Sequence, residues 1–452
     1  MKKILIYSLI FILQLFNANM VNAEENKGYD LSFEQAYELM LVNSNELKSA
    51  EYGKTAARYE RNSARGLFSP KVGINTTVAM LDHDIAMKVP GLGTMPLQNK
   101  NLWLGSAGVV WNVFTGGKII AANQIANAKY GISDYRYIQK KSALMTDLIK
   151  KYYGVCLMQD VLKVREEVLT LTEKHLSDAI KYEQQGLIAK SERLHAEVAK
   201  AKAERDYKAA KKDLNVANSA LYRLIKADGV NADNIAINPQ SRLFMSNNDL
   251  PDIKNVQTAI LDNSPLLKQA KAKTKITKAV YNSKKADYLP MVSVGAYDIF
   301  GADSLSNLVP RMALAATANM TVFDGFSRYN NLKAAKAVNM QAKIDVDVLE
   351  NKLLTYSEKL YSDILKAKEQ YESTDKSIES AKEALRITTL SFKEGFSPSL
   401  SVTDAQTALS GEKIARLKAM YDYDVSLAQL IELCGDTDEI FDYINNSVTE
   451  RL

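Results

Sequence analysis

Two glycine-centred stretches decide the fold. The first reads Tyr-Glu-Gln-Gln-Gly-Leu-Ile-Ala-Lys-Ser-Glu over residues 182–192, and the second reads Phe-Lys-Glu-Gly-Phe-Ser-Pro-Ser-Leu-Ser-Val-Thr-Asp over residues 392–404. Each places one glycine between two long runs of helix-forming residues. Glycine adopts a positive φ at little cost, so each stretch predicts a hairpin tip between antiparallel helices, at Gly186 and at Gly395.

The two tips belong to an internal duplication. Pro70 recurs as Pro290, with an offset of 220 residues, and other pairs in this part of the chain keep the same offset. Gly186 recurs as Gly395, with an offset of 209. The first copy therefore carries 11 extra residues between positions 72 and 114. We expect two structural repeats, because unrelated segments would not hold one offset across a whole helical hairpin.

The N-terminus has the three parts of a secretory signal peptide. Two lysines at positions 2 and 3 precede an apolar run over 4–16, which is too short to span a bilayer, and Ala23 is suited to cleavage. A retained membrane anchor is the alternative, and no cysteine offers a lipid attachment site at the cleavage point. In order, we expect a signal peptide (1–23), a first repeat (24–227), a linker (228–250), a second repeat (251–435) and a C-terminal tail (436–452).

Composition and motifs exclude several classes of protein. The formal net charge is +5, and loss of the two lysines with the signal peptide leaves +3, so nucleic-acid binding is not expected. Three scattered histidines and the lack of a phosphate-binding or dinucleotide-binding motif predict neither an enzyme nor a cofactor or metal site. Asp82-His83-Asp84 is expected to be a polar loop. Cys156 and Cys434 belong to an exported chain, and their pairing is left open.

Long amphipathic runs predict long helices. Two of them, about 118–184 and 326–393, would each form a helix roughly 100 Å long, which needs a partner along its length. A coiled-coil seam with steps of three and four includes Ala335, Val338, Ala342, Val346, Leu349, Leu353, Tyr356, Leu360, Ile364, Ala367 and Tyr371. Its counterpart in the first copy includes Leu144, Leu148, Tyr152 and Val155. Half-length helices are expected to stack in pairs along the long ones, over residues 32–65, 191–225, 252–288 and 398–434.

Four short stretches alternate apolar residues with small or polar ones, as β-strands do. They cover residues 71–80, 101–114, 290–299 and 311–323. Their length suits a membrane span, and they pair as two hairpins, 71–114 and 290–323, with loops at 81–100 and 300–310. Four strands cannot close a barrel, and open sheet edges are not tolerated in lipid. The strands are therefore pooled between subunits or belong to a soluble sheet.

Aromatic residues mark the ends of these strands. Trp103, Trp111, Phe114 and Phe323 are predicted to form the interfacial girdles that flank the apolar band of a membrane sheet. For Phe114 and Phe323, burial between helix and strand is the alternative.

Over essentially all of its mature length, the chain resembles the TolC family of outer membrane efflux and secretion channels. The pieces that carry the resemblance are residues 31–39, 111–117, 322–325 and 421–430, together with the two glycine tips. No single piece is specific, but their duplicated order is. The resemblance implies a homotrimer in which four strands per subunit make a twelve-stranded barrel in outer-membrane lipid. It also implies a conduit of coiled-coil helical hairpins that crosses the periplasm.

The resemblance further implies that the hairpin tips contact a periplasmic adaptor protein. The residues concerned are Gly186, Leu187, Ile188, Gly395, Phe396 and Ser397. Exposed apolar side chains at a tip are costly unless a partner covers them. The alternative is that these side chains only pack the hairpin.

Two acids near the tips are candidates for a pore constriction. Asp404 matches a position where relatives place a carboxylate facing the pore, and three symmetric copies would attract cations. Glu192 matches an acid that in relatives binds an aromatic hydroxyl and an arginine. Those partner positions are Phe392 and Ser397 here, so that latch cannot form. A solvated helix face is the alternative for either acid.

The function expected from these observations is a passive exit duct in the outer membrane, working with a periplasmic adaptor and an inner-membrane transporter. One alternative is the outer-membrane component of a type I protein secretion system. An alternative of another class is a coiled-coil scaffold in the periplasm or on the cell surface that forms no channel. The cargo, the class of pump and the gating of the entrance stay open.

Overall fold

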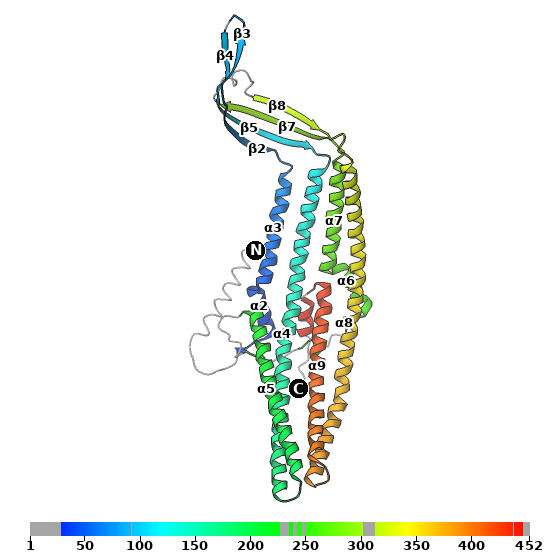
Figure 1. Ribbon diagram of the computed structural model, residues 1–452. Helices are drawn as coiled ribbons and strands as arrows, with labels where there is room; N and C mark the ends of the chain where they lie inside the picture. The colour runs from blue at the N-terminus through cyan, green and yellow to red at the C-terminus, as the bar shows by residue number, and fades with distance from the viewer. Residues whose placement is uncertain are drawn as a thin grey trace. The chain divides into compact units, whose positions relative to one another are not determined.

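The computed structural model describes residues 29–91, 93–226, 235–237, 242–245, 250–301, 312–436 and 438–445 (Figure 1). The predicted signal peptide lies outside the described residues, as do most of the predicted linker, most of the predicted loop 300–310 and part of the predicted C-terminal tail. The rest of the chain is mostly helical with a small β part, which confirms the predicted balance of helix and sheet. The trimer and the closed barrel stay predictions.

The main helices come in pairs of equal length. They are α2 (Phe33–Asn43) and α6 (Ile253–Asn263) with 11 residues, α3 (Asn45–Gly66) and α7 (Pro265–Ala286) with 22, α4 (Lys118–Gln184) and α8 (Ser327–Lys393) with 67, and α5 (Lys190–Ile225) and α9 (Ser399–Cys434) with 36. The first two pairs are offset by 220 residues and the last two by 209, the offsets seen in the sequence. Among the described residues, no helix combines the length and apolarity needed to cross a membrane.

Two predicted half-length helices are each broken in two. The run 32–65 divides into α2 and α3 at Ser44, and 252–288 divides into α6 and α7 at Ser264. Ser44 is extended, and its hydroxyl accepts a hydrogen bond from the Leu47 N–H, so it caps α3. Ser264 is followed by Pro265, which cannot donate to a preceding turn. The prediction of continuous helices was wrong, although these capping residues are visible in the sequence.

The predicted seam along α8 is buried at seven positions, which are Ala335, Ala342, Val346, Leu353, Leu360, Ile364 and Ala367. Val338 and Tyr356 were predicted in the same seam, but both are exposed. Each lies three residues from a buried position, which turns it about 60° away, to the edge of the stripe. The four seam positions named in α4 are all buried.

The chain forms two compact units, which we call the tip unit and the sheet unit. The tip unit comprises 1–43, 151–240 and 377–417, and the sheet unit comprises 44–150, 241–376 and 418–452. In the tip unit, Phe33 packs against the rings of Tyr152 and Tyr153. The Tyr152 hydroxyl donates to the Leu31 carbonyl at 2.8 Å, which satisfies this buried polar group.

Within each unit, shorter helices pack along parts of the long ones. In the sheet unit, Lys54 of α3 pairs with Asp134 of α4 at 2.5 Å, and Thr277 of α7 bonds Asn339 of α8. In the tip unit, Arg193 of α5 pairs with Glu183 of α4. The long helices therefore have the partners that their length requires.

Four strands form one antiparallel sheet in the order β2-β5-β7-β8. Their bounds are β2 (Lys71–Met80), β5 (Asn101–Phe114), β7 (Met291–Gly301) and β8 (Met312–Asn319), so β8 is shorter than the predicted run. Both predicted hairpins are confirmed, and the pairing of β5 with β7 joins them. The outer edges of β2 and β8 pair with no strand in the described part of the chain.

The register separates the two kinds of side chain. One face of the sheet carries a row formed by Val72, Val109, Ala296 and Leu314, and the opposite face carries Asn75, Ser106, Ser293 and Thr317. The predicted alternation therefore yields a predominantly apolar face. The opposite face carries small and polar residues together with larger apolar or aromatic ones, which include Leu102, Leu104, Val110, Tyr297 and Ile299. Both Gly105 and Gly108 lie under an aromatic ring of β7, where a Cβ would collide with Phe300 or Tyr297.

The predicted loop 81–100 is not irregular. It contains a two-stranded hairpin, β3 (Ile85–Val89) with β4 (Gly93–Gln98), which accounts for the extra residues of the first copy. In the tip unit, β1 (Tyr29–Asp30) pairs in parallel with β6 (Ile235–Ala236). Sequence reasoning missed both sheets, because their strands are short and their apolar pattern is weak.

Candidate functional site at the helical hairpin tips

Both hairpin tips lie in the tip unit and share one backbone geometry. Gly186 has φ +73° and Gly395 has φ +80°. The N–H of Leu187 donates to the Tyr182 carbonyl at 2.8 Å, and the N–H of Phe396 donates to the Ser391 carbonyl at the same distance. These bonds satisfy the last carbonyls of α4 and α8 in the manner of a Schellman motif, in which glycine supplies the left-handed residue.

The predicted adaptor-contacting residues do not all face solvent. Leu187 is 65% exposed and Phe396 is 83% exposed. Ile188 is half-buried against a cluster of Ala179, Ala196, Phe392 and Val402, which we call the tip cluster. Ser397, its counterpart in the second tip, is also half-buried. Leu187 and Phe396 therefore project, while Ile188 packs the tip.

The tip cluster fastens the two hairpins together. Its four buried side chains come from α4, α5, α8 and α9, one from each helix. Small alanines let the helices approach closely, and the ring of Phe392 fills the space between them. The two tips therefore pack against each other through this shared apolar cluster.

Glu192 joins the hairpins through the backbone. Its Oε2 accepts a hydrogen bond from the N–H of Ser399, the first residue of α9, at 2.6 Å. A carboxylate at this position satisfies an orphan donor and complements the positive end of the helix dipole. Glu192 therefore engages the backbone of the second hairpin, whereas the side chains of Phe392 and Ser397 form no hydrogen bond with it in the part of the chain that the structure describes.

His175 braces the same point from a third helix. Its Nε2 lies 2.7 Å from the Ser399 hydroxyl, and its ring lies 4.6 Å from the ring of Phe392. Burial lowers the pKa of His175, and the carboxylates of Asp178 and Glu192 oppose that shift. Glu192 binds the Ser399 backbone while His175 binds its hydroxyl, so these groups form a structural brace.

Sequence reasoning treated His175 as one of three scattered histidines. It lies four residues before Ala179 and seven before Tyr182, so helical periodicity already placed it on the packed face of α4. That signal identifies the burial of His175. The partner Ser399 is 224 positions away and follows only from the packing of α9.

Asp404 is exposed on α9, one turn beyond the capped end of the helix. It makes no hydrogen bond or ion pair with the residues that the structure describes. Glu192 differs from it, because its carboxylate is engaged in the cap. Of the two predicted constriction residues, only Asp404 offers an unengaged carboxylate.

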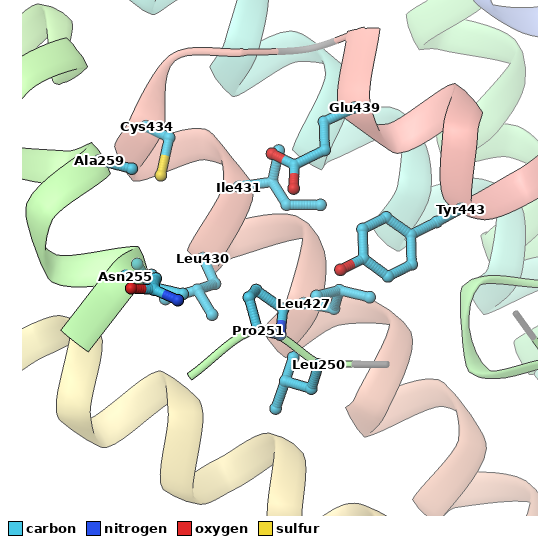
Figure 2. A pocket seen from close by; sticks show the side chains of 11 residues that line it. Leu250, Pro251, Asn255, Ala259, Leu427, Leu430, Ile431, Cys434, Glu439 and Tyr443 are labelled. Atoms are coloured by element: carbon cyan, nitrogen blue, oxygen red, sulfur yellow. The ribbon is translucent and has the colours of Figure 1, made fainter. Parts of the chain in front are cut away.

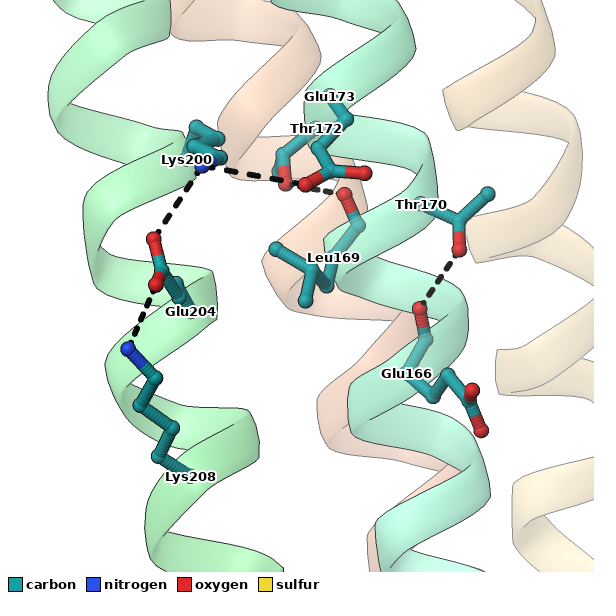
Figure 3. Close-up of polar contacts among 8 residues, drawn as sticks. All are labelled: Glu166, Leu169, Thr170, Thr172, Glu173, Lys200, Glu204 and Lys208. Carbon is teal, nitrogen blue, oxygen red and sulfur yellow. Dashed lines mark hydrogen bonds and ion pairs between the residues drawn. The ribbon is translucent and has the colours of Figure 1, made fainter.

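Ion pairs lie along the surface of the helical hairpin formed by α4 and α5 (Figure 3). Glu204 accepts from Lys208 at 2.6 Å and from Lys200 at 3.2 Å, and these hydrogen bonds lower its pKa. Lys200 also reaches Glu173 of α4 at 3.9 Å. Exposed pairs of this kind contribute little to stability. The hairpin is held mainly by the buried alanine seam of α5, at Ala196, Ala199, Ala203 and Ala210.

The predicted girdle aromatics lie on the sheet unit. Trp103 packs edge-on against Phe300, and the Nε1 of Trp111 donates to the Phe68 carbonyl at 2.8 Å. Phe114 and Phe323 are both exposed in the single chain. Neither is therefore buried in a helix–strand junction, the alternative considered above.

The linker is anchored to α9 by a buried acid. Asp424 accepts a hydrogen bond through Oδ1 from the N–H of Phe244, which lies in a short 3₁₀ helix, η2 (Leu243–Met245). The ring of Phe244 packs between Tyr371 and Tyr423. Burial raises the pKa of Asp424 to about 7, against the opposing effects of Arg242 and of this hydrogen bond.

A small apolar pocket lies beside the last helix, α10 (Asp438–Asn445) (Figure 2). It has a volume of about 240 Å³ and is lined from α6, α9 and α10, with Cys434 and Glu439 at its wall. Burial raises the pKa of the Cys434 thiol to about 12, which makes it unreactive. Cys156 is buried and Cys434 is half-buried, and the structure shows no disulfide at either of these cysteines.

The acidic side chains of the polar loop at 82–84 make local contacts. Asp82 contacts its neighbour His83, and Asp84 accepts a hydrogen bond from the Lys100 N–H. Across the described residues, no group of three histidine, cysteine or acidic side chains could hold a metal ion.

A sequence profile of the family described as "Outer membrane efflux protein" matches residues 36–226 and 256–436. The chain belongs to this family. Among solved structures, CusC has a TM-score of 0.76 at 15% identity, covering 92% of this chain and 95% of CusC. VceC of Vibrio cholerae has a TM-score of 0.73 at 16% identity, covering 89% and 95%. CmeC of Campylobacter jejuni has a TM-score of 0.75 at 14% identity, covering 95% and 94%.

At these identities the likeness to solved structures shows the fold alone, whereas the profile match shows membership of the outer membrane efflux protein family. No curated protein sequence is similar enough to count as a match. The family is described as one of outer membrane efflux proteins, and CmeC is described as an outer membrane channel.

Proposed function

We propose that this protein is the outer-membrane exit duct of a tripartite efflux pump. Three copies pool their sheets into a twelve-stranded barrel, and the helical hairpins form a conduit through the periplasm. The observation that carries this proposal is the sheet itself, which has one predominantly apolar face and two edges that pair with no strand in the described part of the chain. Membership of the outer membrane efflux protein family supports it.

The open edges explain why copies must associate. An unpaired strand edge in lipid leaves backbone N–H and C=O groups without partners, at a cost of several kcal/mol for each group. The exposed edge of β2 in one copy can pair with that of β8 in the next, which removes every edge when the ring closes. Four strands from each of three copies reach a number typical of bacterial barrels.

The tips supply the docking surface. Leu187 and Phe396 project from equivalent positions of two tips that are packed into one object. Large apolar side chains held in water favour a partner that covers them. A periplasmic adaptor fits this role, and it would connect the duct to an inner-membrane transporter that supplies the energy. The carboxylate of Asp404 is the candidate for the constriction.

The proposal is tested by a matched pair of charge substitutions in β8. Leu314 lies on the apolar face and Thr317 on the opposite face. A lysine facing lipid costs about 2–4 kcal/mol near the bilayer centre, whereas one facing a water-filled lumen is tolerated. We expect Leu314→Lys to abolish the outer-membrane species that runs at trimer mass unheated and at monomer mass after heating. Thr317→Lys should keep that species, and its conductance in planar bilayers should change in ion selectivity.

If the two variants behave alike, the sheet does not lie in the membrane with its apolar face toward lipid. If the unsubstituted chain is a soluble periplasmic monomer, the exit-duct function is wrong and the coiled-coil scaffold is favoured.

A further inference from the structure

Helix α7 is unusually basic. It carries seven lysines and no aspartate or glutamate in 22 residues. Five of the lysines, at positions 268, 271, 275, 278 and 285, recur at steps of three, four or seven and therefore share one face. Like charges at this spacing cost an isolated helix about 0.2–0.5 kcal/mol per pair. The stripe lowers stability unless a negative group balances it.

Two of these lysines face a groove between α7 and α4, which run side by side in the sheet unit (Figure 1). The groove has a volume of about 560 Å³, and buried alanines of both helices form its floor. Its rim carries only basic or neutral polar groups, which are Lys275, Lys278 and Asn282 on α7 and Gln124, Asn127 and Tyr135 on α4. No carboxylate lines it.

The two lysines of the rim are not neutralised. Neither Lys275 nor Lys278 forms an ion pair with any residue in the described part of the sheet unit. Lys271, one turn away, is paired with Glu350 at 3.3 Å. On the other side of α4, Lys140 is paired with Glu46 at 2.5 Å. Lys275 and Lys278 therefore present unpaired positive charge to the groove between α4 and α7.

Gly131 of α4 keeps this groove open. It lies inside a long helix, where glycine costs about 0.5–1 kcal/mol relative to alanine. A Cβ placed on it would meet no atom within 4 Å, and the residue lines the groove. The position is therefore not needed for close helix packing, and it leaves space beside the two lysines.

We propose that the groove between α4 and α7 binds an oxyanion, the phosphate, sulfate or carboxylate group of a small solute or of a phospholipid headgroup. The ammonium groups of Lys275 and Lys278 supply the charge. The side-chain amides of Gln124, Asn127 and Asn282 supply further hydrogen-bond donors. Binding here does not depend on the exit-duct function, since every group named belongs to a single chain.

The test uses the full-length protein in neutral detergent, titrated calorimetrically with inorganic pyrophosphate. We expect Lys275→Gln/Lys278→Gln to weaken binding at least about tenfold, the effect of losing two charge-assisted contacts. The matched control is Lys273→Gln/Lys284→Gln, which removes the same charge from the other side of α7 and should leave binding unchanged. Gly131→Leu keeps both lysines but fills the groove, and it should also abolish binding.

A second arm distinguishes the source of the anion. If dihexanoyl phosphatidylglycerol competes with pyrophosphate and dihexanoyl phosphatidylcholine does not, the site binds anionic lipid headgroups. Pyrophosphate binding without such competition assigns it to soluble anions. The proposal is overturned if pyrophosphate does not bind, if the control variant loses as much affinity as the groove variant, or if Gly131→Leu binds normally. Unchanged thermal unfolding of all variants shows that the comparison is between folded proteins.

Discussion

The carboxylate of Glu192 accepts a hydrogen bond from the backbone N–H of Ser399 at 2.6 Å. An acid in the first turn of α5 thereby caps the N-terminus of α9, 207 positions away. The same Ser399 offers its hydroxyl to the buried imidazole of His175. Ser399 of the second hairpin is therefore held to the first hairpin both by its backbone and by its side chain.

Removing this cap should loosen the junction. We expect Glu192→Ala to reduce the free energy of unfolding by about 1–2 kcal/mol, the usual cost of losing a helix cap with a favourable dipole interaction. Hydrogen exchange of the amides at 399–402 should accelerate. The matched control is Glu197→Ala, because Glu197 forms an exposed pair with Arg193 and its loss should cost less than about 1 kcal/mol. Equal effects of the two substitutions would show that the cap contributes nothing special.

The His175 brace should weaken in acid. Its pKa in the folded protein lies below the ordinary value of 6.5. His175 therefore binds a proton more readily in the unfolded chain than in the folded chain. The stability from the neutral imidazole is fully present above about pH 6.5 and is lost as the pH falls toward the folded pKa. The loss cannot exceed about 1.4 kcal/mol per pH unit, the slope for one proton.

Unfolding of the tip unit, followed by hydrogen exchange between pH 5 and pH 8, measures this dependence. We expect His175→Gln to flatten the acid limb. His195→Gln, at an exposed position of α5, should leave the profile unchanged. An acid limb that persists in His175→Gln would assign the titration to another group.

Asp424 should show the opposite dependence. Its folded pKa of about 7 lies above the ordinary value of 3.8, so its contribution is fully present below about pH 3.8 and is lost as the pH rises through about 7. The neutral side chain of Asp424→Asn can still accept the Phe244 N–H. We expect this variant to gain stability relative to the unsubstituted protein, from nearly nothing at pH 4 to on the order of 4 kcal/mol above pH 7.

Denaturant midpoints at pH 4 and pH 8 check the sign. Asp404→Asn is the control, because Asp404 is exposed and its substitution should shift both midpoints equally or not at all. A destabilised Asp424→Asn at pH 8 would mean that the ionised carboxylate, paired with Arg242, is the form that holds the linker.

Substitutions at the tips should distinguish residues that contact the adaptor from residues that stabilise the hairpins. Leu187→Ser and Phe396→Ser remove exposed apolar surface. We therefore expect the free energy of unfolding to change by less than about 0.5 kcal/mol, while binding of the adaptor is lost. Ile188→Ser removes a side chain from the tip cluster and should destabilise the tip by about 1–3 kcal/mol. Pull-down from cells that carry an epitope on the adaptor, with melting of each purified variant, distinguishes the two effects. If the Leu187→Ser/Phe396→Ser variant still binds the adaptor, the tips are not part of the docking surface.

Several features of the fold followed from the sequence because they depend on neighbours along the chain. The spacing of apolar residues determined the long helices, whose predicted ends at 118 and 184 coincide with those of α4. Glycines with positive φ determined the tips, since no other residue adopts that conformation as easily. Alternation with period two determined which strand residues share a face. The duplication was visible as two constant offsets.

Other features depended on contacts between segments far apart in the chain. The order of the sheet, with β5 beside β7, joins two hairpins that local pattern predicts separately. The cap at Ser399, the buried Asp424 beside the linker and the lysine groove each bring together residues from different helices. Periodicity tells which face of a helix is buried but not which helix covers it. That choice is made by packing in three dimensions, so only the tertiary structure shows which polar groups meet.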